Sequence, residues 1–489
     1  MELAVIGCGY VGLVSSACLA EIGHDVICVD SDEKKIAALE GGDIPIHERF
    51  VPELLQRHHG RRLTFSTSLA EAVERSSVVF IAVGTPAASN GEADLSYVEE
   101  VARGIAHSAS EPRLIVEKST VPVYTCEWIR QVSRLAGKQK DIEVVSNPEF
   151  LREGTAVTDF LYPDRIILGA DSQEAAATMK AIYAPLTSGQ YYQSHRVTPW
   201  GETVAEYKAA RLIVTSTKSA ELIKHAANAF LAAKISFINA VANLCEAVGA
   251  DIAQVCEGIG SDTRIGSRFL QPGIGYGGSC FPKDVKAFRT VAKESGFEFR
   301  LLDEVARINE EQIERFARKV RNALWNLKGK RIAALGLAFK TGTDDIRESP
   351  AIALIQRLLK EGSEIRAYDP AAMQRAAEVL PSVRFFRDAY AAARGADAIL
   401  ILTDWPELAN LNLKRLRSDV RQPIVIDGRN LYSPQAMAEA GFFYHSVGRE
   451  SVAPLKHTPR TQHPALPDAL IRHIQSHSER ELEAGQEAN

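Results

Sequence analysis

The sequence predicts an α/β fold in which two doubly wound, parallel-sheet domains are joined by a long central helix. Three observations carry this prediction. A short apolar segment at the N-terminus runs into a glycine-rich turn and an apolar helix, the stretch between residues 201 and 249 contains no glycine or proline, and a second strand–helix–strand pattern follows residue 330. Buried strands that alternate with helices are typical of Rossmann-like sheets.

Composition indicates an ordinary soluble globular protein of two or three domains. Its 489 residues are 46% hydrophobic and 24% charged, with a formal net charge of -5. This balance gives no electrostatic reason to expect nucleic acid or an anionic membrane as a partner. The 7 cysteines contain no CxxC pair, which argues against a disulfide framework and against a metal site. A cytoplasmic location is expected, because the uncharged run at residues 3–20 carries a glycine-rich turn that signal sequences lack.

The first strand is predicted at residues 3–6, and the glycines Gly7, Gly9 and Gly12 follow it as Gly-x-Gly-x-x-Gly. A second strand at residues 25–30 ends in Asp30. Glycines at this spacing permit a tight turn beside a pyrophosphate, and the carboxylate accepts from the ribose 2′-OH. A 2′-phosphate would be repelled by the carboxylate, so the pattern predicts NAD rather than NADP.

Three further strands are predicted at residues 78–86, 114–122 and 142–150, and each ends in small or polar residues. The carboxyl ends of parallel strands line the ligand crevice of a doubly wound sheet. Thr85, Thr120 and Glu149 are therefore expected to face cofactor or substrate.

The glycine-free stretch predicts one long helix at residues 218–248, of the kind that spans domains and often carries a dimer interface. The second unit repeats the opening at residues 330–340, 350–360 and 364–370, but its turn lacks Gly-x-Gly-x-x-Gly, so it should bind another nucleotide. The predicted divisions are 1–215 for the NAD-binding domain, 216–325 for the central region, 326–450 for the second Rossmann-like domain and 451–489 for a flexible tail.

Cys280 lies in "GGSCFPKD", a thiol on glycine-rich backbone. Lys283 is expected to lower the pKa of the thiol, which would make it a nucleophile. A buried structural cysteine is the alternative. In "KHAANAF", Lys224 and Asn228 are spaced i and i+4 and share one helix face, where they either serve the site or lie in solvent.

These segments together resemble one known family. The sequences "GCGYVG", "VGTP", "KSTVP", "NPEFLREG", "GGSCFPKD", "FKTGTDDIRESP" and "DGRN" occur in the order found in the UDP-glucose/GDP-mannose dehydrogenase family. The resemblance covers residues 1 to about 447. It implies a four-electron oxidation of UDP-glucose to UDP-glucuronate with two NAD, through a thiohemiacetal and a thioester on Cys280.

The resemblance also implies roles for particular residues. Cys280 would be the nucleophile, Lys224 and Asn228 would stabilise the oxyanion, Asp284 with Thr120 would position water or a proton, and Glu149 would be the base for thioester hydrolysis. The implied NAD contacts are Gly7, Gly9, Tyr10, Val11, Gly12, Asp30, Lys35, Thr85, Thr120, Glu153, Lys283 and Arg347. The implied substrate contacts are Phe150, Leu151, Arg152, Glu153, Lys224, Asn228, Arg264, Phe269, Leu270, Gly273, Gly277 and Lys340. Arg264 would come from a neighbouring subunit, which makes a homodimer part of the site.

Several alternatives stay open at this point. The same motifs suit a GDP-mannose 6-dehydrogenase or another nucleotide-sugar dehydrogenase, and a nucleotide-sugar-binding protein without turnover is a third possibility. The alternative for Arg347 and Glu348 is a helix-capping salt bridge. For Lys35 it is a solvated surface lysine, and for Glu153 it is an exposed residue in the first turn of a helix. The segment at residues 190–217 is longer than the resemblance leads one to expect, and a short helix is predicted within it at 202–210. It would act as a lid, an interface or a passive insertion.

Overall fold

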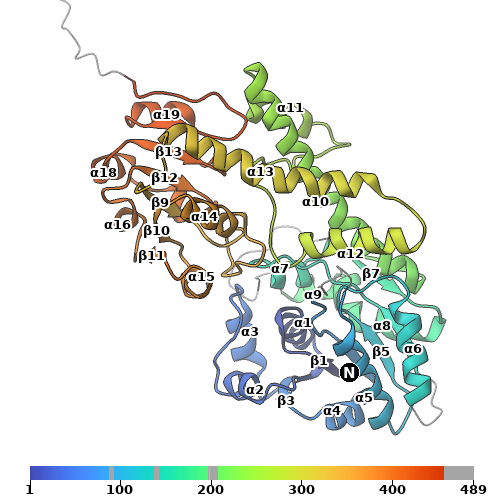
Figure 1. The fold of residues 1–489 in the computed structure, drawn as a ribbon. Helices are drawn as coiled ribbons and strands as arrows, with labels where there is room; N and C mark the ends of the chain where they lie inside the picture. Colours follow the sequence, from blue (N-terminus) through green and yellow to red (C-terminus); the bar gives the residue numbers. More distant parts are fainter. Residues whose placement is uncertain (87–92, 137–141, 196–197, 199–207, 456–489) are drawn as a thin grey trace, which may run out of the picture.

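The structure is a computed structural model that describes residues 1–86, 93–136, 142–195, 198 and 208–455. It contains two sheets joined by a helical region. Figure 1 shows the N-terminal sheet (blue to cyan) and the C-terminal sheet (orange to red) at opposite ends of two long helices, α10 (Thr217–Val248) and α13 (Arg300–Leu324). The predicted fold of two doubly wound sheets joined by a long central helix is confirmed.

The first sheet has eight strands in the order β3-β2-β1-β4-β5-β6-β7-β8. All of its neighbouring strands are parallel except β6 and β7. The chain runs outward from β1 in one direction and from β4 in the other, so these two neighbours mark the switch point where such sheets bind ligands. The strands are β1 (Glu2–Ile6), β2 (Asp25–Val29), β3 (Leu63–Ser66), β4 (Val78–Ile81), β5 (Leu114–Glu117), β6 (Glu143–Ser146), β7 (Arg165–Gly169) and β8 (Arg211–Thr215).

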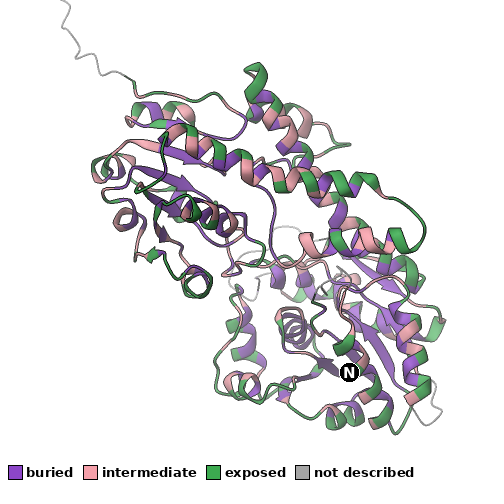
Figure 2. Ribbon diagram, viewed as in Figure 1, coloured by how far each residue is buried: buried purple, intermediate pink, exposed green. Residues whose placement is uncertain are grey.

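Both faces of this sheet are buried, because alternate residues of each strand point to opposite sides. Leu3 and Val5 of β1 pack in one apolar cluster, and Ala4 and Ile6 pack in the other. Figure 2 shows the strands as buried and the outer faces of the surrounding helices as exposed. These helices are α1 (Tyr10–Glu21), α2 (Glu33–Glu40), α3 (Val51–His58), α4 (Leu69–Arg75), α5 (Ser96–Ser108), α6 (Thr125–Ala136), α7 (Ala156–Leu161), α8 (Gln173–Thr187) and α9 (Gln190–Ser194).

The turn between β1 and α1 requires glycine at two of its three positions for packing. Gly7 has φ of +106°, and a Cβ there would lie 2.6 Å from the carbonyl oxygen of Ala82. A Cβ on Gly12 would lie 1.7 Å from the carbonyl oxygen of Gly7. A Cβ on Gly9 would meet nothing within 4 Å, so this part of the turn is open. The second glycine is the one at which such a turn approaches pyrophosphate.

The helical region contains α10, α11 (Ile252–Gly260), α12 (Phe281–Glu294) and α13. The 32 residues of α10 make a helix about 48 Å long, and it ends where Gly249 adopts φ of 78°. The prediction of one long helix from residue 218 to 248 is confirmed to within a residue. Helix α10 packs against α12, α13 and the strand β7, so it connects the first sheet to the rest of the chain.

One side of α10 is apolar and exposed. Within the described residues, α10 is the one helix long and apolar enough, by length and composition, to cross a membrane. Its polar residues Glu221 and Lys224 are nevertheless buried against other elements of the fold, at 2% and 3% exposure. These contacts explain α10 as a core helix. Its outer side presents large apolar residues at helical spacing, namely Leu222, Phe230, Phe237, Leu244 and Val248.

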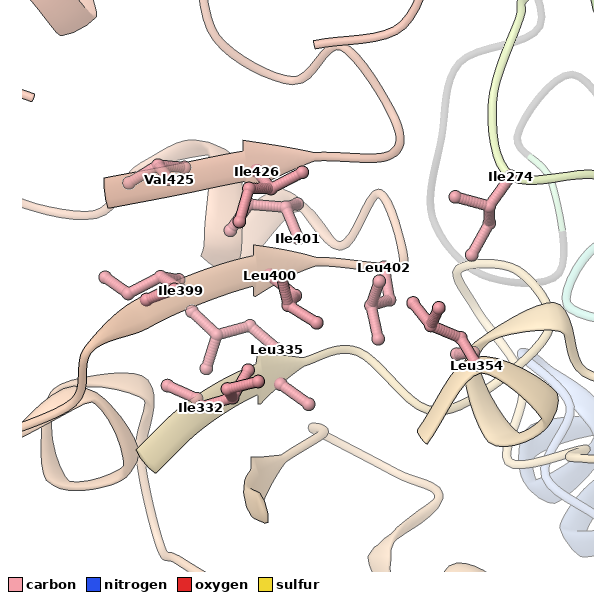
Figure 3. Packing of buried hydrophobic residues seen from close by; sticks show 14 of the residues in the cluster. Ile274, Ile332, Leu335, Leu354, Ile399, Leu400, Ile401, Leu402, Val425 and Ile426 are labelled. Atoms are coloured by element: carbon pink, nitrogen blue, oxygen red, sulfur yellow. The ribbon is translucent and has the colours of Figure 1, made fainter. Parts of the chain in front are cut away.

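The second sheet has six parallel strands in the order β11-β10-β9-β12-β13-β14. Its core is aliphatic, and Figure 3 shows Ile274, from the loop before α12, beside Leu354 and Leu402 of this core. The strands are β9 (Arg331–Leu335), β10 (Glu364–Tyr368), β11 (Arg384–Phe385), β12 (Ala398–Ile401), β13 (Ile424–Asp427) and β14 (Phe443–His445). The helices are α14 (Pro350–Lys360), α15 (Met373–Val379), α16 (Ala389–Ala393), α17 (Pro406–Ala409), α18 (Leu413–Asp419) and α19 (Pro434–Glu439).

The segment at residues 190–217 begins as packed structure. Tyr191 and Tyr192 of α9 are buried, and the Tyr192 hydroxyl donates to the Leu161 carbonyl at 3.0 Å. Residues 211–215 then add the strand β8 beside β7, which sequence analysis did not predict. Of the helix predicted at 202–210, residues 202–207 lie outside the described residues, and residues 208–210 are not helical.

The predicted tail lies mostly outside the described residues, from 456 onward. Its first residues belong to the folded chain. Val452 and Tyr444 exchange backbone hydrogen bonds of 2.9 and 3.0 Å. The chain therefore stays in contact with the second sheet beyond residue 450.

Candidate active site

The polar residues predicted from the sequence meet where β4, β5 and β6 end, against α10 and the start of α12. Lys224 of α10 contacts Glu149, which follows β6. Asn228, one turn further along α10, contacts Asp284 of α12. The site is therefore assembled from three elements that are far apart in the sequence.

Glu149 and Lys224 form a buried ion pair. The ammonium donates to Glu149 Oε1 at 2.7 Å. Burial opposes the carboxylate, but Lys224 and the Leu151 N–H outweigh it and lower the pKa of Glu149. Burial likewise opposes the ammonium, but the negative charges of Glu149, Asp284 and Cys280 outweigh it and raise the pKa of Lys224. Both groups are thus charged at neutral pH, and a fixed ammonium in a dry site can stabilise an oxyanion.

Asn228 and Asp284 form a second buried contact beside the first. Asn228 Nδ2 donates to Asp284 Oδ2 at 2.6 Å. Asp284 is 1% exposed, and its Oδ1 has no hydrogen-bond partner among the described residues. The ammonium of Lys283 lies 3.7 Å from Oδ1. A buried carboxylate oxygen without a donor is poised to accept a proton or to hold water.

Lys283 lies toward the strand ends rather than toward the thiol. Its Nζ donates to Thr85 Oγ1 at 3.0 Å, and Thr85 Oγ1 donates to the carbonyl of Thr120 at 2.9 Å. These two hydrogen bonds join α12 to the loops that follow β4 and β5. Sequence analysis expected Thr85 and Thr120 to face the same crevice, and the structure brings them into direct contact.

Cys280 is the N-cap residue of α12 and is partly exposed. Its Sγ lies 3.5 Å from Ser279 Oγ. Burial and the nearby Glu149 raise the pKa of the Cys280 thiol, while Lys224 opposes them. The expectation that Lys283 lowers this pKa is wrong, because Lys283 is engaged by Thr85 and Asp284. The lysine that favours the thiolate is Lys224.

The glycines before Cys280 serve domain packing as well as access. A Cβ on Gly277 would lie 2.1 Å from the carbonyl of Glu348, and one on Gly278 would lie 2.6 Å from the Phe339 ring. Both partners belong to the segment after β9. The loop at residues 269–278 thus packs closely against the C-terminal part of the chain. The sequence pattern alone did not indicate this contact.

The same loop is anchored at Gly273. Its N–H donates to Asn239 Oδ1 at 2.8 Å, and its carbonyl accepts from Gln312 Nε2 at 2.8 Å. Leu270 is buried in the core of the second sheet, and the Phe269 and Phe281 rings lie 6.2 Å apart. The predicted substrate residues Phe269, Leu270, Gly273 and Gly277 therefore lie on one ordered loop between α11 and α12.

The cofactor residues meet at the end of β2. Asp30 accepts from the Cys8 N–H at 2.8 Å and from Lys35 Nζ at 2.8 Å. Burial opposes the Asp30 charge, but Lys35 and the backbone donors outweigh it and lower its pKa. Lys35 is therefore paired with Asp30, which excludes the interpretation of a solvated lysine. An open Gly9 at the N-terminus of α1, with a carboxylate at the end of β2, fits a dinucleotide.

The second sheet lacks this arrangement, as its sequence indicates. Asp369, which follows β10 as Asp30 follows β2, is 0% exposed. Its carboxylate accepts from the N–H groups of Leu337 and Ala338 and from the Trp405 indole. Because protein donors already occupy it, Asp369 is not presented to a ribose.

The loop at residues 150–155 lies over the ion pair. The Phe150 ring lies 5.4 Å from Lys224 Nζ. Arg152 is held by Asp159, with Nη2 to Oδ1 at 2.6 Å. Glu153 accepts from Ser279 Oγ at 2.9 Å and from Thr343 Oγ1 at 3.1 Å. Glu153 thus bridges the first sheet, the segment before Cys280 and the segment after β9, and it is not an exposed first-turn residue.

The remaining predicted contacts lie on the far side of the site. Arg347 pairs with Asp345 at 2.6 Å and with Glu153 at 3.4 Å. Burial lowers the pKa of Lys340, whose Nζ lies 5.7 Å from the Phe339 ring centroid. Arg264 pairs with Asp262 in the loop after α11, and its side chain is 87% exposed. That exposure leaves Arg264 accessible to a second chain.

The sequence patterns did not single out Arg429, although it lies in the "DGRN" motif. Arg429 donates to the carbonyls of Leu402 at 2.9 Å and Phe339 at 3.0 Å. Its Nη1 would lie 3.4 Å from a Cβ on Gly273, so it lines the 269–278 loop. The available sequence signal was an arginine that directly follows an aspartate and a glycine at the end of a strand.

Two residues next to predicted ones were also missed. His225 Nε2 and the Val121 carbonyl lie 2.7 Å apart in a fully buried contact. Lys118 Nζ donates to Asn147 Oδ1 at 3.2 Å, and burial lowers its pKa to about 8. Both hold the strand-end loops around Glu149 and Thr120. Within the described ranges, no group of three or more histidine, cysteine, aspartate or glutamate residues could hold a metal ion.

The first sheet carries a dinucleotide turn, and the chain also has a second Rossmann-like sheet. A cysteine and a lysine ammonium lie between the two sheets. Together these features define an NAD-dependent dehydrogenase. The chain belongs to the UDP-glucose/GDP-mannose dehydrogenase family. The family's NAD-binding domain matches residues 1–187, its central domain residues 218–311 and its UDP-binding domain residues 333–434.

Relatives with this architecture are similar over nearly the whole chain. A UDP-glucose 6-dehydrogenase of Bacillus subtilis is 44% identical over 454 residues, covering 92% of this chain and 94% of the relative. One from Rhizobium meliloti is also 44% identical, covering 92% and 100%. The structure of a UDP-glucose dehydrogenase from Pyrobaculum islandicum superposes with a TM-score of 0.82 at 36% identity, covering 92% and 98%.

Proposed function

We propose that this enzyme oxidises the C6 alcohol of UDP-glucose to the carboxylate of UDP-glucuronate in two NAD-dependent steps, through covalent intermediates on Cys280. The observation that carries the proposal is the convergence of Lys224, Glu149, Asn228 and Asp284 on the start of the helix that Cys280 caps. The relatives named UDP-glucose 6-dehydrogenase support the substrate.

The first step removes a proton from the C6 hydroxyl and a hydride from C6. NAD bound at the turn of the first sheet would supply the hydride acceptor. Asp284 Oδ1, which lacks a hydrogen-bond donor among the described side chains, accepts the hydroxyl proton through a water held beside Thr120. The product of this step is an aldehyde.

The aldehyde carbon then accepts the sulfur of Cys280. The S–H bond breaks, a C–S bond forms, and the thiol proton ends on the aldehyde oxygen, which becomes the hydroxyl of a thiohemiacetal. Lys224 and Asn228 donate to that oxygen as negative charge develops. Removal of a second hydride and of the hydroxyl proton converts the thiohemiacetal to a thioester.

Hydrolysis completes the reaction and frees the thiol. Glu149 accepts a proton from water as the water adds to the thioester carbon, the C–S bond breaks, and Cys280 leaves as thiolate. The contact between Lys224 and Glu149 sets the order of these events, because the paired carboxylate is a weak base. When the ammonium turns to the substrate oxygen, Glu149 loses its counter-charge and becomes a stronger base.

The nucleotide part of the substrate belongs between the 269–278 loop and the second sheet. Lys340 and Arg429 supply positive charge there, and Gly273 lets the backbone lie close to Arg429. The UDP-binding domain of the family matches the sheet on this side. Arg264 of a second chain would add to the same charge.

Dimerisation is part of the proposal. The outer side of α10 exposes Leu222, Phe230, Phe237, Leu244 and Val248, and Phe230 and Val248 are each 67% exposed. Burying such a stripe against a second copy would be favourable. The divisions at residues 215, 325 and 450 remain our proposal for the domains, and a cytoplasmic location remains a prediction.

The test is the number of NADH formed per sugar consumed. With UDP-glucose limiting, the expected value is two, against little NADH from GDP-mannose and UDP-N-acetylglucosamine in parallel reactions. A value of one would remove the thioester step. Two NADH from another nucleotide sugar, and none from UDP-glucose, would keep the chemistry and replace the substrate. Binding of NAD and UDP-glucose without NADH would contradict the proposal that the chain is a catalyst.

A further inference from the structure

One buried carboxylate outside the catalytic cluster joins the two ligand-binding parts of the first sheet. Glu48 lies in the connection between α2 and α3 and is 5% exposed. Its Oε2 accepts from the Tyr10 hydroxyl, the first residue of α1 and a member of the glycine-rich turn. The same oxygen accepts from the Gly154 N–H at 2.5 Å, and Oε1 accepts from the Ala156 N–H at 2.8 Å.

The two sides of this contact have different predicted ligands. Tyr10 follows Gly9, where the turn is open to a pyrophosphate. Gly154 belongs to the loop at residues 150–155, which lies over the Lys224–Glu149 pair. Helix α1 contacts both α3 and α7, and Figure 1 shows the three helices close together. Glu48 is therefore the polar bridge between the cofactor turn and the loop over the catalytic residues.

A change in the position of Gly154 would also displace residues outside the first sheet. Gly154 has φ of +83°, and a Cβ there would lie 2.7 Å from the carbonyl of Gly342, so the backbones of the two parts of the chain touch. The preceding residue, Glu153, accepts from Ser279 at 2.9 Å, and Ser279 lies beside Cys280. The chain of contacts from Tyr10 through Glu48 therefore ends at the proposed nucleophile and at the C-terminal part of the chain.

A glutamine could not replace Glu48 in this network. Three donors, one hydroxyl and two backbone N–H groups, point at two carboxylate oxygens. A carboxylate accepts on both oxygens, whereas an amide offers one acceptor and turns an NH2 donor toward the remaining donors. Buried N–H groups left without an acceptor destabilise the conformation that buries them.

We propose that Glu48 is a positioning residue that couples occupancy of the cofactor turn to the placement of the 150–155 loop. A cofactor bound at the turn would fix the position of Tyr10, and Tyr10 fixes Glu48 through their hydrogen bond. Glu48 in turn fixes the backbone of Gly154 and Ala156 in the position that favours binding of the nucleotide sugar. Because binding linkage is reciprocal, the sugar nucleotide must favour the cofactor by the same factor. This inference rests on the proposed function and adds cooperativity between its two ligands.

The experiment measures the Kd of NAD by calorimetry, without and with saturating UDP-glucuronate, which carries the sugar but has no C6 alcohol to oxidise. The wild-type ratio of the two Kd values is expected to be at least about fivefold. Tyr10→Phe keeps the ring and removes only the hydroxyl, so it should fold normally and bring the ratio to within about twofold of one. Glu48→Gln should do the same or more. The matched control is Tyr97→Phe, at an exposed tyrosine of α5.

The outcomes separate this inference from the proposed function. Failure of NAD or UDP-glucuronate to bind the wild-type protein would contradict the proposed function. Binding of both with a wild-type ratio near one would overturn the coupling, and so would an unchanged ratio in Tyr10→Phe. In a double variant Tyr10→Phe/Glu48→Gln the two losses should not add, because the hydroxyl and the carboxylate contact each other and both accept from the Gly154 N–H.

Discussion

Lys224 and Glu149 form an ion pair that is almost completely buried from solvent. Nζ and Oε1 lie 2.7 Å apart, and the two side chains are 4% and 5% exposed. Lys224 comes from the central helix and Glu149 from the end of a sheet strand, so the contact joins two structural units as well as two charges. It supplies the ammonium and the base of the proposed chemistry from a single pair.

Lys224→Met should destabilise the protein, because it leaves the Glu149 carboxylate buried without its counter-charge. The expected loss in the free energy of unfolding is about 3–5 kcal/mol, measured by urea unfolding at neutral pH. Adding Glu149→Gln should restore part of that loss. Lys218→Met on the same helix is the control, since Lys218 pairs with Glu127 at the surface, and it should leave stability unchanged. Equal losses in the two single variants would contradict the importance of the buried pair.

Cys280→Ser should abolish the second oxidation while NAD and UDP-glucose still bind. Serine is a poorer nucleophile at neutral pH, so the rate of UDP-glucuronate formation should fall on the order of 10³-fold or more. Calorimetry would show that binding survives, and chromatography would quantify the product. Cys256→Ser, at a partly exposed cysteine of α11, should keep the wild-type rate. Wild-type product formation by Cys280→Ser would exclude the covalent route.

Glu117→Gln should change how stability depends on pH. Glu117 is 1% exposed, and burial raises its pKa to about 8. The unfolded chain releases this proton near the ordinary value of about 4.3, so the folded chain binds more protons between these values and its stability falls as pH rises through that window. The variant should remove this fall, which urea unfolding at pH 5 and pH 8 would measure. Glu99→Gln, at a glutamate paired with Arg103 on the surface, should keep it.

Asp30→Ala should weaken NAD binding and narrow the preference for NAD over NADP. The substitution removes the predicted acceptor for the ribose 2′-OH and releases Lys35, whose ammonium can then meet a 2′-phosphate. The kcat/KM ratio of NAD to NADP should fall about tenfold or more, corresponding to one charged hydrogen bond. Asp32→Ala, two residues away at the cap of α2, is the control. An unchanged ratio in Asp30→Ala would place cofactor selection elsewhere.

Phe230→Asp should convert the protein to a monomer if the exposed stripe of α10 is a dimer interface. Phe230 is 67% exposed in the single chain, and a charge at its centre would oppose burial against a second copy. Light scattering after gel filtration would give the mass. Phe297→Asp, at a phenylalanine 60% exposed in the turn before α13, is the control. A dimeric Phe230→Asp variant would move the interface to another surface.

Much of the architecture was predictable because it depends on local patterns. The absence of glycine and proline up to residue 248, together with apolar residues at helical spacing from residue 218, predicted α10 almost to its ends. The spacing of Gly7, Gly9 and Gly12 predicted a tight turn that leaves the backbone open to a pyrophosphate, and the φ of Gly7 and the open space at Gly9 agree with it. The close packing at Gly12 was found only in the structure. The strand β8 escaped prediction because a short edge strand has a weak pattern and depends on β7 for its pairing.

The site was predictable in its members and much less so in their contacts. Resemblance to a family pointed to Cys280, Lys224 and Asp284, but proximity in sequence wrongly made Lys283 the partner of the thiol. That lysine turns to Thr85, about 200 residues earlier in the chain. Glu48 lies in a connecting segment whose neighbours come from other elements, so no local pattern marks it. Arg429 was marked only by the aspartate and glycine that precede it.

The sequence by itself determined most strands of the two sheets, the central helix and the dinucleotide turn, because periodicity and glycine spacing act over a few residues. Its motifs named the reactive groups through their resemblance to a family. Only the tertiary structure decided which charges pair, since burial and the approach of distant segments set those energies. It paired Lys224 with Glu149 and left one oxygen of Asp284 without a donor among the described residues. It also placed Glu48 in hydrogen-bond contact with Tyr10 and Gly154. Those choices come from long-range packing, which removes water and leaves each buried polar group dependent on whichever partner the fold brings near.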